Sequence, residues 1–241
     1  MKSVVFVGGT ISNMISAIEL SNHFEVYVFE LNAEIGLPSI SPGIIFDIQQ
    51  LARYITEEQI SFLQPKEIED GYSVRSEWVL KHLAVTAAEK NVQIFTRTRI
   101  SESFLTKNGF SIEYTGAGPN SMGQIECNFL VDDRQWTHSP PGAKNHNINV
   151  EPSLQPNFGS FHPMHGGTAL TSDCTDIPTT ITTYNRHEGL TEVWQRSPEW
   201  IPKHGWIESI SCQLPQLKKN RTIDAQIQTG RLTANHLNEV N

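Results

Sequence analysis

Clustered basic residues and long apolar runs are both missing from this sequence. Its 18 Lys and Arg residues are scattered and are outnumbered by 26 Asp and Glu, which gives a formal net charge of −8. Nucleic-acid backbones reward clustered positive charge, so this composition argues against a nucleic-acid partner. No run approaches the roughly 18 consecutive apolar residues of a transmembrane helix, and no small-residue cleavage site follows the apolar stretch at residues 4–7. We therefore expect a cytoplasmic protein with no membrane partner.

Cysteine is scarce. Cys127, Cys174 and Cys212 are odd in number and far apart, so the sequence has neither a disulfide framework nor a CxxC pair. The segment "FHPMHGG" sets His162 and His165 three residues apart, but no third ligand has a matching spacing, and we expect no metal site. Both histidines are expected in a glycine-flanked loop; the alternative is that one lines a substrate pocket and donates a proton.

The composition is that of a globular protein. Apolar residues make up 38% of the chain and charged residues 18%, with much of the remaining polarity in Asn, Gln, Ser and Thr. A chain of 241 residues buries one substantial core. This length accommodates one elaborated domain, or one domain with a small cap.

The first thirty residues change their hydrophobic period in the manner of a βαβ unit. A continuous apolar run at residues 4–7 predicts a strand that is covered on both faces. Apolar residues then recur at helical spacing, at Ile11, Met14, Ile15 and Ile18. A second apolar run at residues 26–29 ends at Glu30. The order predicts two parallel strands with a right-handed crossover.

The rest of the chain gives weaker signals of mixed α/β structure. After the βαβ unit we expect a helix over 45–55, a short strand over 72–75, a helix over 76–90 and a third parallel strand over 92–96. A meander of strands follows near 104–105, 110–114 and 125–129, and the chain returns to the parallel sheet over 129–132. The remainder is expected to be a long ordered loop over 134–167, a hairpin of 179–184 with 190–195, and a closing helix over 222–237. Gly230 falls within the closing helix, where glycine costs about 1 kcal/mol against alanine. We expect it to mark close packing against a neighbour or a ligand.

The turn after the first strand has the outline of a dinucleotide-binding site. In such a turn the first glycine permits the tight bend, the second lets the backbone approach the pyrophosphate, and the third lets helix and strand pack closely. Gly8 fills the first place, Thr10 the second and Asn13 the third. The amides at the helix start attract an anion through the backbone alone. Glu30 ends the second strand, where an acid accepts hydrogen bonds from a ribose and disfavours the extra phosphate of NADP.

Three segments resemble the FAD-dependent oxidoreductases of the aromatic-hydroxylase, geranylgeranyl-reductase and lycopene-cyclase type. They are "VVFVGGTISNMISAIEL" followed by "VYVFELNAEIG", "VRSEWVLKHLAVTAAEKNVQIFTRTRI" and "IDAQIQTGRLTANHL". The resemblance touches about half of the chain. It implies that Gly8, Gly9 and Thr10 face the pyrophosphate, Glu30 the adenosine ribose, and Arg75 the phosphates or ribose.

The sequence differs from this group in three places. Asn13 replaces the packing glycine, "FLVDDRQWTHSP" stands where the group has a strand that ends in a small-residue and glycine turn, and no Gly-Asp pair precedes the closing helix. These differences motivate a second hypothesis, in which the chain keeps the fold but has lost flavin chemistry and serves as an accessory or assembly partner. A plain NAD-binding reductase is a third alternative, which leaves the closing helix unexplained.

Two further segments carry clustered aromatic or charged residues. Trp194, Trp200 and Trp206 either stack on a planar substrate or bury area in a cap that has little core, and we favour burial. Asp132, Asp133 and Arg134 are expected to form a surface ion pair at a strand end.

The prediction as a whole is an α/β protein with an FAD/NAD(P)-binding Rossmann-like parallel sheet, a β-meander and a small α+β cap. We expect the dinucleotide-binding core over 1–141, the reduced cap over 142–215, and a C-terminal helix over 216–241 that returns to the core. The preferred function is a small flavin-dependent oxidoreductase or monooxygenase-like enzyme acting on a small organic substrate, with FAD as cofactor and NAD(P)H as candidate electron donor. A homo-oligomer or a partner enzyme fits either hypothesis, and no residue is singled out as the catalytic base.

Overall fold

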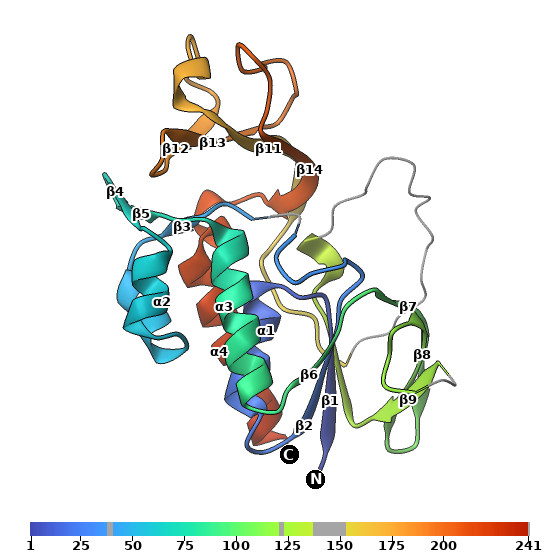
Figure 1. Ribbon diagram of the computed structural model, residues 1–241. Coiled ribbons are helices and arrows are strands. Elements are labelled where there is room, and N and C mark those ends of the chain that lie inside the picture. Colours follow the sequence, from blue (N-terminus) through green and yellow to red (C-terminus); the bar gives the residue numbers. More distant parts are fainter. Residues whose placement is uncertain (38–40, 121–122, 137–152, 241) are drawn as a thin grey trace.

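A four-stranded parallel sheet forms the centre of the molecule (Figure 1). The computed structural model describes residues 1–37, 41–120, 123–136 and 153–240. The strand order is β10-β1-β2-β6, with β10 at Phe129–Asp132, β1 at Ser3–Val7, β2 at Glu25–Phe29 and β6 at Gln93–Phe95. Every pairing in this sheet is parallel, so the carboxyl ends of all four strands meet at one edge.

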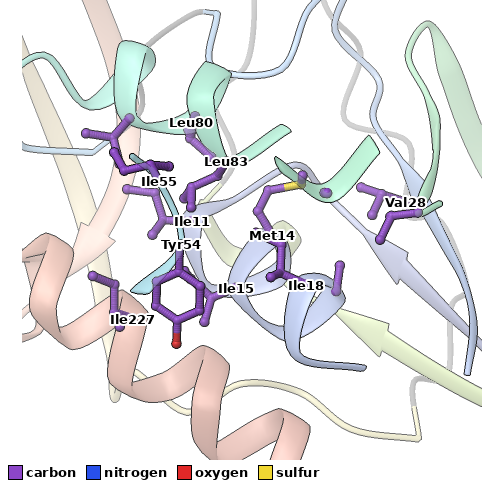
Figure 2. Close-up of a cluster of buried hydrophobic side chains, with 14 of the residues drawn as sticks. Ile11, Met14, Ile15, Ile18, Val28, Tyr54, Ile55, Leu80, Leu83 and Ile227 are labelled. Carbon is purple, nitrogen blue, oxygen red and sulfur yellow. The ribbon is translucent and has the colours of Figure 1, made fainter. Parts of the chain in front are cut away.

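Three long helices cover one face of the parallel sheet (Figure 1). They are α1 at Ile11–Leu20, α3 at Ser76–Glu89 and α4 at Ile223–Glu239. Their apolar residues meet in one buried cluster, which includes Ile11, Met14, Leu83 and Ile227 (Figure 2). The cluster fixes the start of α1 over the carboxyl edge of the sheet.

The closing helix α4 lies directly against α1, and Gly230 is the contact point. A Cβ at Gly230 would lie 2.4 Å from the backbone oxygen of Ser12 and 2.8 Å from Cβ of Ile15. The hydroxyl of Ser16 donates a hydrogen bond to the carbonyl of Gly230 at 2.8 Å. The prediction that this glycine marks close packing is confirmed, with a neighbouring helix as the partner.

A β-meander covers the opposite face of the sheet. It consists of β7 at Thr98–Thr106, β8 at Gly109–Gly116 and β9 at Gln124–Cys127. Side chains alternate along a strand, so Val4 and Phe6 of β1 join the cluster under the helices, while Val5 and Val7 join the cluster under the meander. This double cover explains why β1 is apolar at consecutive positions.

The cap is a second, antiparallel sheet of four strands. Its order is β12-β13-β11-β14, with β12 at Thr182–Asn185, β13 at Leu190–Gln195, β11 at Phe161–Leu170 and β14 at Glu208–Pro215. A smaller sheet joins β3 at Ile44–Ile45, β5 at Gly71–Ser73 and β4 at Lys66–Ile68, and the short helix α2 at Glu57–Phe62 lies in the chain between β3 and β4.

The structure confirms the α/β class, the βαβ unit, the third parallel strand, the meander, the hairpin and the closing helix. The helix expected over 45–55 is wrong. The segment instead contains strand β3 and a 3-10 helix, η1, at Ile48–Arg53. The carboxylate of Asp224 accepts hydrogen bonds from the amides of Phe46 and Asp47, at 2.7 and 3.0 Å, and so holds the chain extended before η1 begins.

The loop expected over 134–167 is also wrong at its end, because β11 begins at Phe161. This strand is held between β13 and β14, two partners that are distant in sequence. The boundary predicted between residues 141 and 142 lies outside the described residues. Within the described part of the chain, no helix combines the length and the apolar character that a membrane crossing requires.

Candidate nucleotide site and the cavities of the cap

The turn from β1 into α1 has the backbone of an anion site. Gly8 has a φ of +97°, in the left-handed region that favours glycine, and its amide donates to the carbonyl of Phe29 at 2.9 Å. Thr10 caps the helix, since its hydroxyl accepts a hydrogen bond from the amide of Asn13 at 3.2 Å. Helix geometry leaves the first-turn amides of Ile11 and Ser12 without an intrahelical acceptor, so they point out of the helix end.

Asn13 fills the space that a third glycine would leave between helix and strand. Its side chain is completely buried, and Nδ2 donates to the carbonyls of Val7 at 3.1 Å and Gly8 at 2.8 Å. Its Oδ1 is buried with no hydrogen-bond partner among the described residues. The amide therefore ties α1 to the end of β1, where a glycine would allow direct contact.

Glu30 stands at the end of β2, beside the Gly8 turn. Its carboxylate accepts three hydrogen bonds of 2.7 Å, from the amide of Gly9 and from the backbone and side-chain nitrogens of Asn32. A Cβ at Gly9 would lie 2.4 Å from Cδ1 of Ile35 and 3.0 Å from Oε2 of Glu30. Gly9 therefore permits the close approach of Glu30 to the turn.

Asp133 is a buried carboxylate at the same helix end. Its Oδ2 accepts hydrogen bonds from the hydroxyls of Thr10, at 2.6 Å, and Ser12, and its Oδ1 accepts one from Nε2 of Gln135 at 3.1 Å. Burial raises the pKa of Asp133 from 3.8 to about 6, against the opposite effect of these three hydrogen bonds. The surface position expected for Asp133 is wrong, whereas Arg134 does pair with Asp132, at 2.7 Å.

Sequence reasoning missed the role of Asp133, although a signal for it exists. Asp133 directly follows β10, which pairs with β1 in parallel. The carboxyl ends of neighbouring parallel strands share one edge of a sheet, so a residue just after β10 lies beside the turn at Gly8.

Arg75 forms contacts with side chains of α3 and of the cap. It precedes α3, and its Nε lies 2.5 Å from Oε1 of Glu77, while its Nη2 lies 3.9 Å from Oε1 of Glu208. Its guanidinium also lies over the ring of Trp78, 5.1 Å from the centroid. The structure thus gathers Gly8, Gly9, Thr10, Asn13 and Glu30 around the start of α1, and gives Arg75 partners at the start of α3 and on the cap.

His162 and His165 lie on strand β11 and do not converge. Side chains three apart in a strand face opposite sides of the sheet. His162 lies 3.2 Å, through Nε2, from Nη2 of Arg221, while Nδ1 of His165 lies 2.7 Å from the hydroxyl of Ser211. Burial and the neighbouring arginines lower the pKa of His162. Among the described residues, no group of three His, Cys, Asp or Glu side chains is arranged to hold a metal ion.

A cavity of about 490 Å³ lies on the cap sheet, where residues of β11, β13 and β14 meet Leu37 of the core. Glu192 is its best-connected polar group. The Glu192 carboxylate accepts hydrogen bonds from the amide of Gly43 at 3.1 Å, from Nε1 of Trp194 and from Nη2 of Arg186. Arg186 and Glu192 are both buried, so this is a desolvated ion pair. Trp194 is buried as expected, and it also lines the cavity.

Comparison with known proteins gives a match at the level of fold. Neither a protein-family profile nor a curated protein sequence matches the chain. Among solved structures, glycine oxidase from Geobacillus kaustophilus is 12% identical with a TM-score of 0.59, and the alignment covers 97% of this chain and 94% of that one. CtdE in complex with FAD is 13% identical with a TM-score of 0.56, covering 97% and 84%.

Several similar structures are longer than this chain. The Diels-Alderase PyrE3 is 14% identical with a TM-score of 0.53, and the alignment covers 80% of this chain but 46% of PyrE3. A second CtdE structure, with FAD and a substrate, is covered over 58% of its length. This chain therefore shares its fold with glycine oxidase and CtdE, and it has a Rossmann-type parallel sheet, a β-meander and a β-sheet cap.

Proposed function

We propose that the chain is a small FAD-dependent oxidoreductase that acts on a small organic molecule held against its cap. The proposal rests on one observation. In a flavoprotein fold, the left-handed Gly8 opens α1 at the same sheet edge where Glu30 ends the neighbouring strand. This is the arrangement that a dinucleotide requires of the protein backbone.

The residues at the start of α1 fit the adenosine diphosphate half of FAD. The outward amides of Ile11 and Ser12 suit a diphosphate, since they add partial positive charge without a side chain. Glu30 suits the ribose, because a carboxylate accepts about four hydrogen bonds and three are made within the chain. The remaining lone pair is available to one ribose hydroxyl. Thr10 and Asn13 would border the diphosphate from the helix cap and from beneath the turn.

The flavin, when bound, would supply the hydride or oxygen chemistry. The chain's own contribution would be to bind and orient the substrate in the 490 Å³ cavity of the cap. Thr168 and Glu208 offer hydrogen bonds there, and the indole of Trp194 offers an apolar wall. Arg75 would reach a phosphate only by leaving Glu77, so its role at the cofactor stays a prediction.

An accessory role without flavin chemistry is the second candidate, and the segment before α4 favours it. Where the resembling group has a Gly-Asp pair, this chain has a 3-10 helix at Lys218–Arg221. The side chain of Arg221 is buried there and donates to the carbonyls of Pro215 at 2.6 Å and Gln216 at 3.0 Å. In this role the fold would serve a partner enzyme or a second copy of the chain.

Absorbance of the purified protein separates the two candidates. The oxidoreductase should be yellow, or become yellow with FAD, and should bleach with one member of a panel of amines, 2-hydroxy acids and phenols, or with NAD(P)H. A protein that stays colourless after incubation with FAD and gel filtration would support the accessory role. A protein that binds FAD but is bleached by no substrate would support the proposed FAD site and contradict the proposed oxidoreductase activity.

A further inference from the structure

The side chain of Arg221, at the end of the 3-10 helix η4 (Lys218–Arg221), is a buried cation without a carboxylate partner. It is 8% exposed. Across the part of the chain that the structure describes, neither Arg221 nor the nearby Arg196 forms an ion pair. Arg186 is the matched case in the same cap, because it is buried to a similar extent and the carboxylate of Glu192 balances its charge. A buried charge without a partner is costly, so we expect a counter-ion to lie against Arg221.

Two of the five N–H donors of Arg221 are unused. Nε donates to the carbonyl of Pro215 at 2.6 Å, and Nη2 donates to the carbonyl of Gln216 at 3.0 Å and to Nε2 of His162 at 3.2 Å. These bonds use three donors and fix the plane of the guanidinium. Nη1 makes no hydrogen bond to a described residue, and it is not among the unpaired atoms that the protein encloses completely. An acceptor that arrives from solvent can therefore reach Nη1.

Arg196 adds a second positive charge close to Arg221. It directly follows β13, whose last residue, Gln195, pairs with His165 of β11. Its side chain is exposed, and its charge acts on both Arg221 and His162. Burial lowers the pKa of the Arg221 guanidinium, and the charge of Arg196 lowers it further, as two cations with no anion between them should.

The other titratable groups around this pair do not neutralise it. Glu199 accepts a hydrogen bond at 2.9 Å from the hydroxyl two residues before it, and Asp224 accepts two from backbone amides that precede η1. Tyr184 and Cys212 are neutral, because burial raises the pKa of each. Two exposed lysines of η4 add to the positive charge. The cluster is thus locally cationic on a chain whose formal net charge is −8.

The charge of the cluster selects the class of anion. Two guanidinium groups without carboxylates balance a dianion, whereas a carboxylate would balance only one of them. A phosphate group carries a charge of about −1.5 to −2 at pH 7 and has acceptor oxygens for several donors. Arginine is the side chain best suited to phosphate, since its donors are planar and it is always charged.

We infer that Arg221 and Arg196 form a binding site for a phosphate dianion, either the free ion or the phosphate group of a small phosphorylated molecule. Nη1 of Arg221 donates to one phosphate oxygen from the protein side, and Arg196 contacts the phosphate from the solvent side. His162 accepts from Nη2 and so orients the guanidinium. Neither arginine lines the 490 Å³ cavity, so the site is separate from the proposed substrate site.

Calorimetric titration with inorganic phosphate, at pH 8 and an ionic strength of about 50 mM, tests the inference. We expect saturable 1:1 binding with a Kd of about 0.1–1 mM. Affinity should fall about 5- to 20-fold in Arg196→Gln, and by a similar factor in Arg221→Lys, which keeps the charge but removes Nη1. Lys203→Gln is the matched control, because it removes one exposed cation from the same cap. It should leave phosphate affinity unchanged.

Phenyl phosphate identifies the source of the phosphate group. Binding at least about 5-fold tighter than that of inorganic phosphate would indicate a phosphorylated small molecule, since the phenyl group then adds contacts. Equal or weaker binding would indicate the free ion.

Three results would overturn the inference. They are an absence of saturable phosphate binding, an affinity that Arg196→Gln changes no more than Lys203→Gln does, and acetate that binds as tightly as phosphate. The second result would also arise if the amides of α1 held the phosphate. Thermal unfolding without phosphate checks the fold of each variant, and Arg196→Gln keeps the test decisive if Arg221→Lys unfolds, because Arg196 is exposed.

The titration needs no flavin, so it is independent of the proposed function. A colourless protein that binds phosphate at these arginines would contradict the proposed function alone. A yellow protein that does not bind phosphate would contradict this inference alone.

Discussion

Replacing Asp133 by asparagine should change how the stability of this protein depends on pH. Asp133 is completely buried at the start of α1, where its carboxylate accepts hydrogen bonds from Thr10, Ser12 and Gln135. Asparagine has the same shape and keeps an oxygen for the two hydroxyls, but it never carries a charge. The substitution therefore removes the titration of Asp133 while preserving most of its contacts.

The magnitude follows from the pKa of Asp133, which burial raises from 3.8 to about 6. The native state thus binds this proton more tightly than the unfolded state, so the free energy of unfolding falls as the pH rises from about 4 to about 6 and is level above. Two pKa units correspond to about 3 kcal/mol. The free energy of unfolding of Asp133→Asn, minus that of the native protein, should therefore rise by about 3 kcal/mol between pH 4 and pH 6.

Urea unfolding of both proteins between pH 4 and pH 8 measures this difference. Every other titrating group is common to both chains, so its contribution largely cancels. At pH 4 the variant should be less stable by about 1 kcal/mol, since the amide nitrogen of asparagine cannot accept the bond from Gln135. Glu34→Gln is the control, because it removes one carboxylate from an exposed position, where the side chain is 58% exposed. A stability difference that does not vary with pH would show that Asp133 has the same pKa in the folded and unfolded states.

Two further substitutions test the packing that supports the site. Gly230→Ala should lower the free energy of unfolding by about 1–2 kcal/mol, seen as a lower midpoint of thermal unfolding, because its Cβ would lie 2.4 Å from the carbonyl oxygen of Ser12 and the better helix propensity of alanine offsets only part of the clash. An unchanged or higher midpoint would contradict the contact between α1 and α4. Glu192→Gln should cost about 3–5 kcal/mol in urea unfolding, because it leaves the buried guanidinium of Arg186 without a carboxylate. A loss below about 1 kcal/mol would mean that this ion pair is solvated.

The parts of the fold that local patterns encode could be predicted from the sequence. Residues 4–7 are apolar without alternation because the helices cover Val4 and Phe6 while the meander covers Val5 and Val7. Glycine within a helix lowers its stability, so the presence of Gly230 predicted close packing against another element. In both cases the residue's own neighbourhood contains the information.

The parts that depend on distant partners could not be predicted. Phe161–Leu170 contains proline, histidine and two glycines, and it is a strand because β13 and β14 pair with both of its edges. Aspartate is a residue type that is usually exposed, and the burial of Asp133 follows from the pairing of β10 with β1. Arg186 and Glu192 lie in or beside a polar turn in the sequence, and their burial as an ion pair depends on the packing of the cap against Gly43, whose amide donates to Glu192.

The affinity of the protein for FAD, measured by fluorescence titration of the purified chain and of Glu30→Ala, shows directly whether the start of α1 is a dinucleotide site. We expect saturable 1:1 binding to the native chain and a loss of affinity of about 10- to 100-fold in Glu30→Ala, since one hydrogen bond from the ribose to a charged group disappears. Glu34→Ala, which lies on the surface nearby, should bind FAD as the native chain does. A native chain that takes up no FAD, or the same affinity with and without the Glu30 carboxylate, would contradict the claim that the start of α1 is a dinucleotide site.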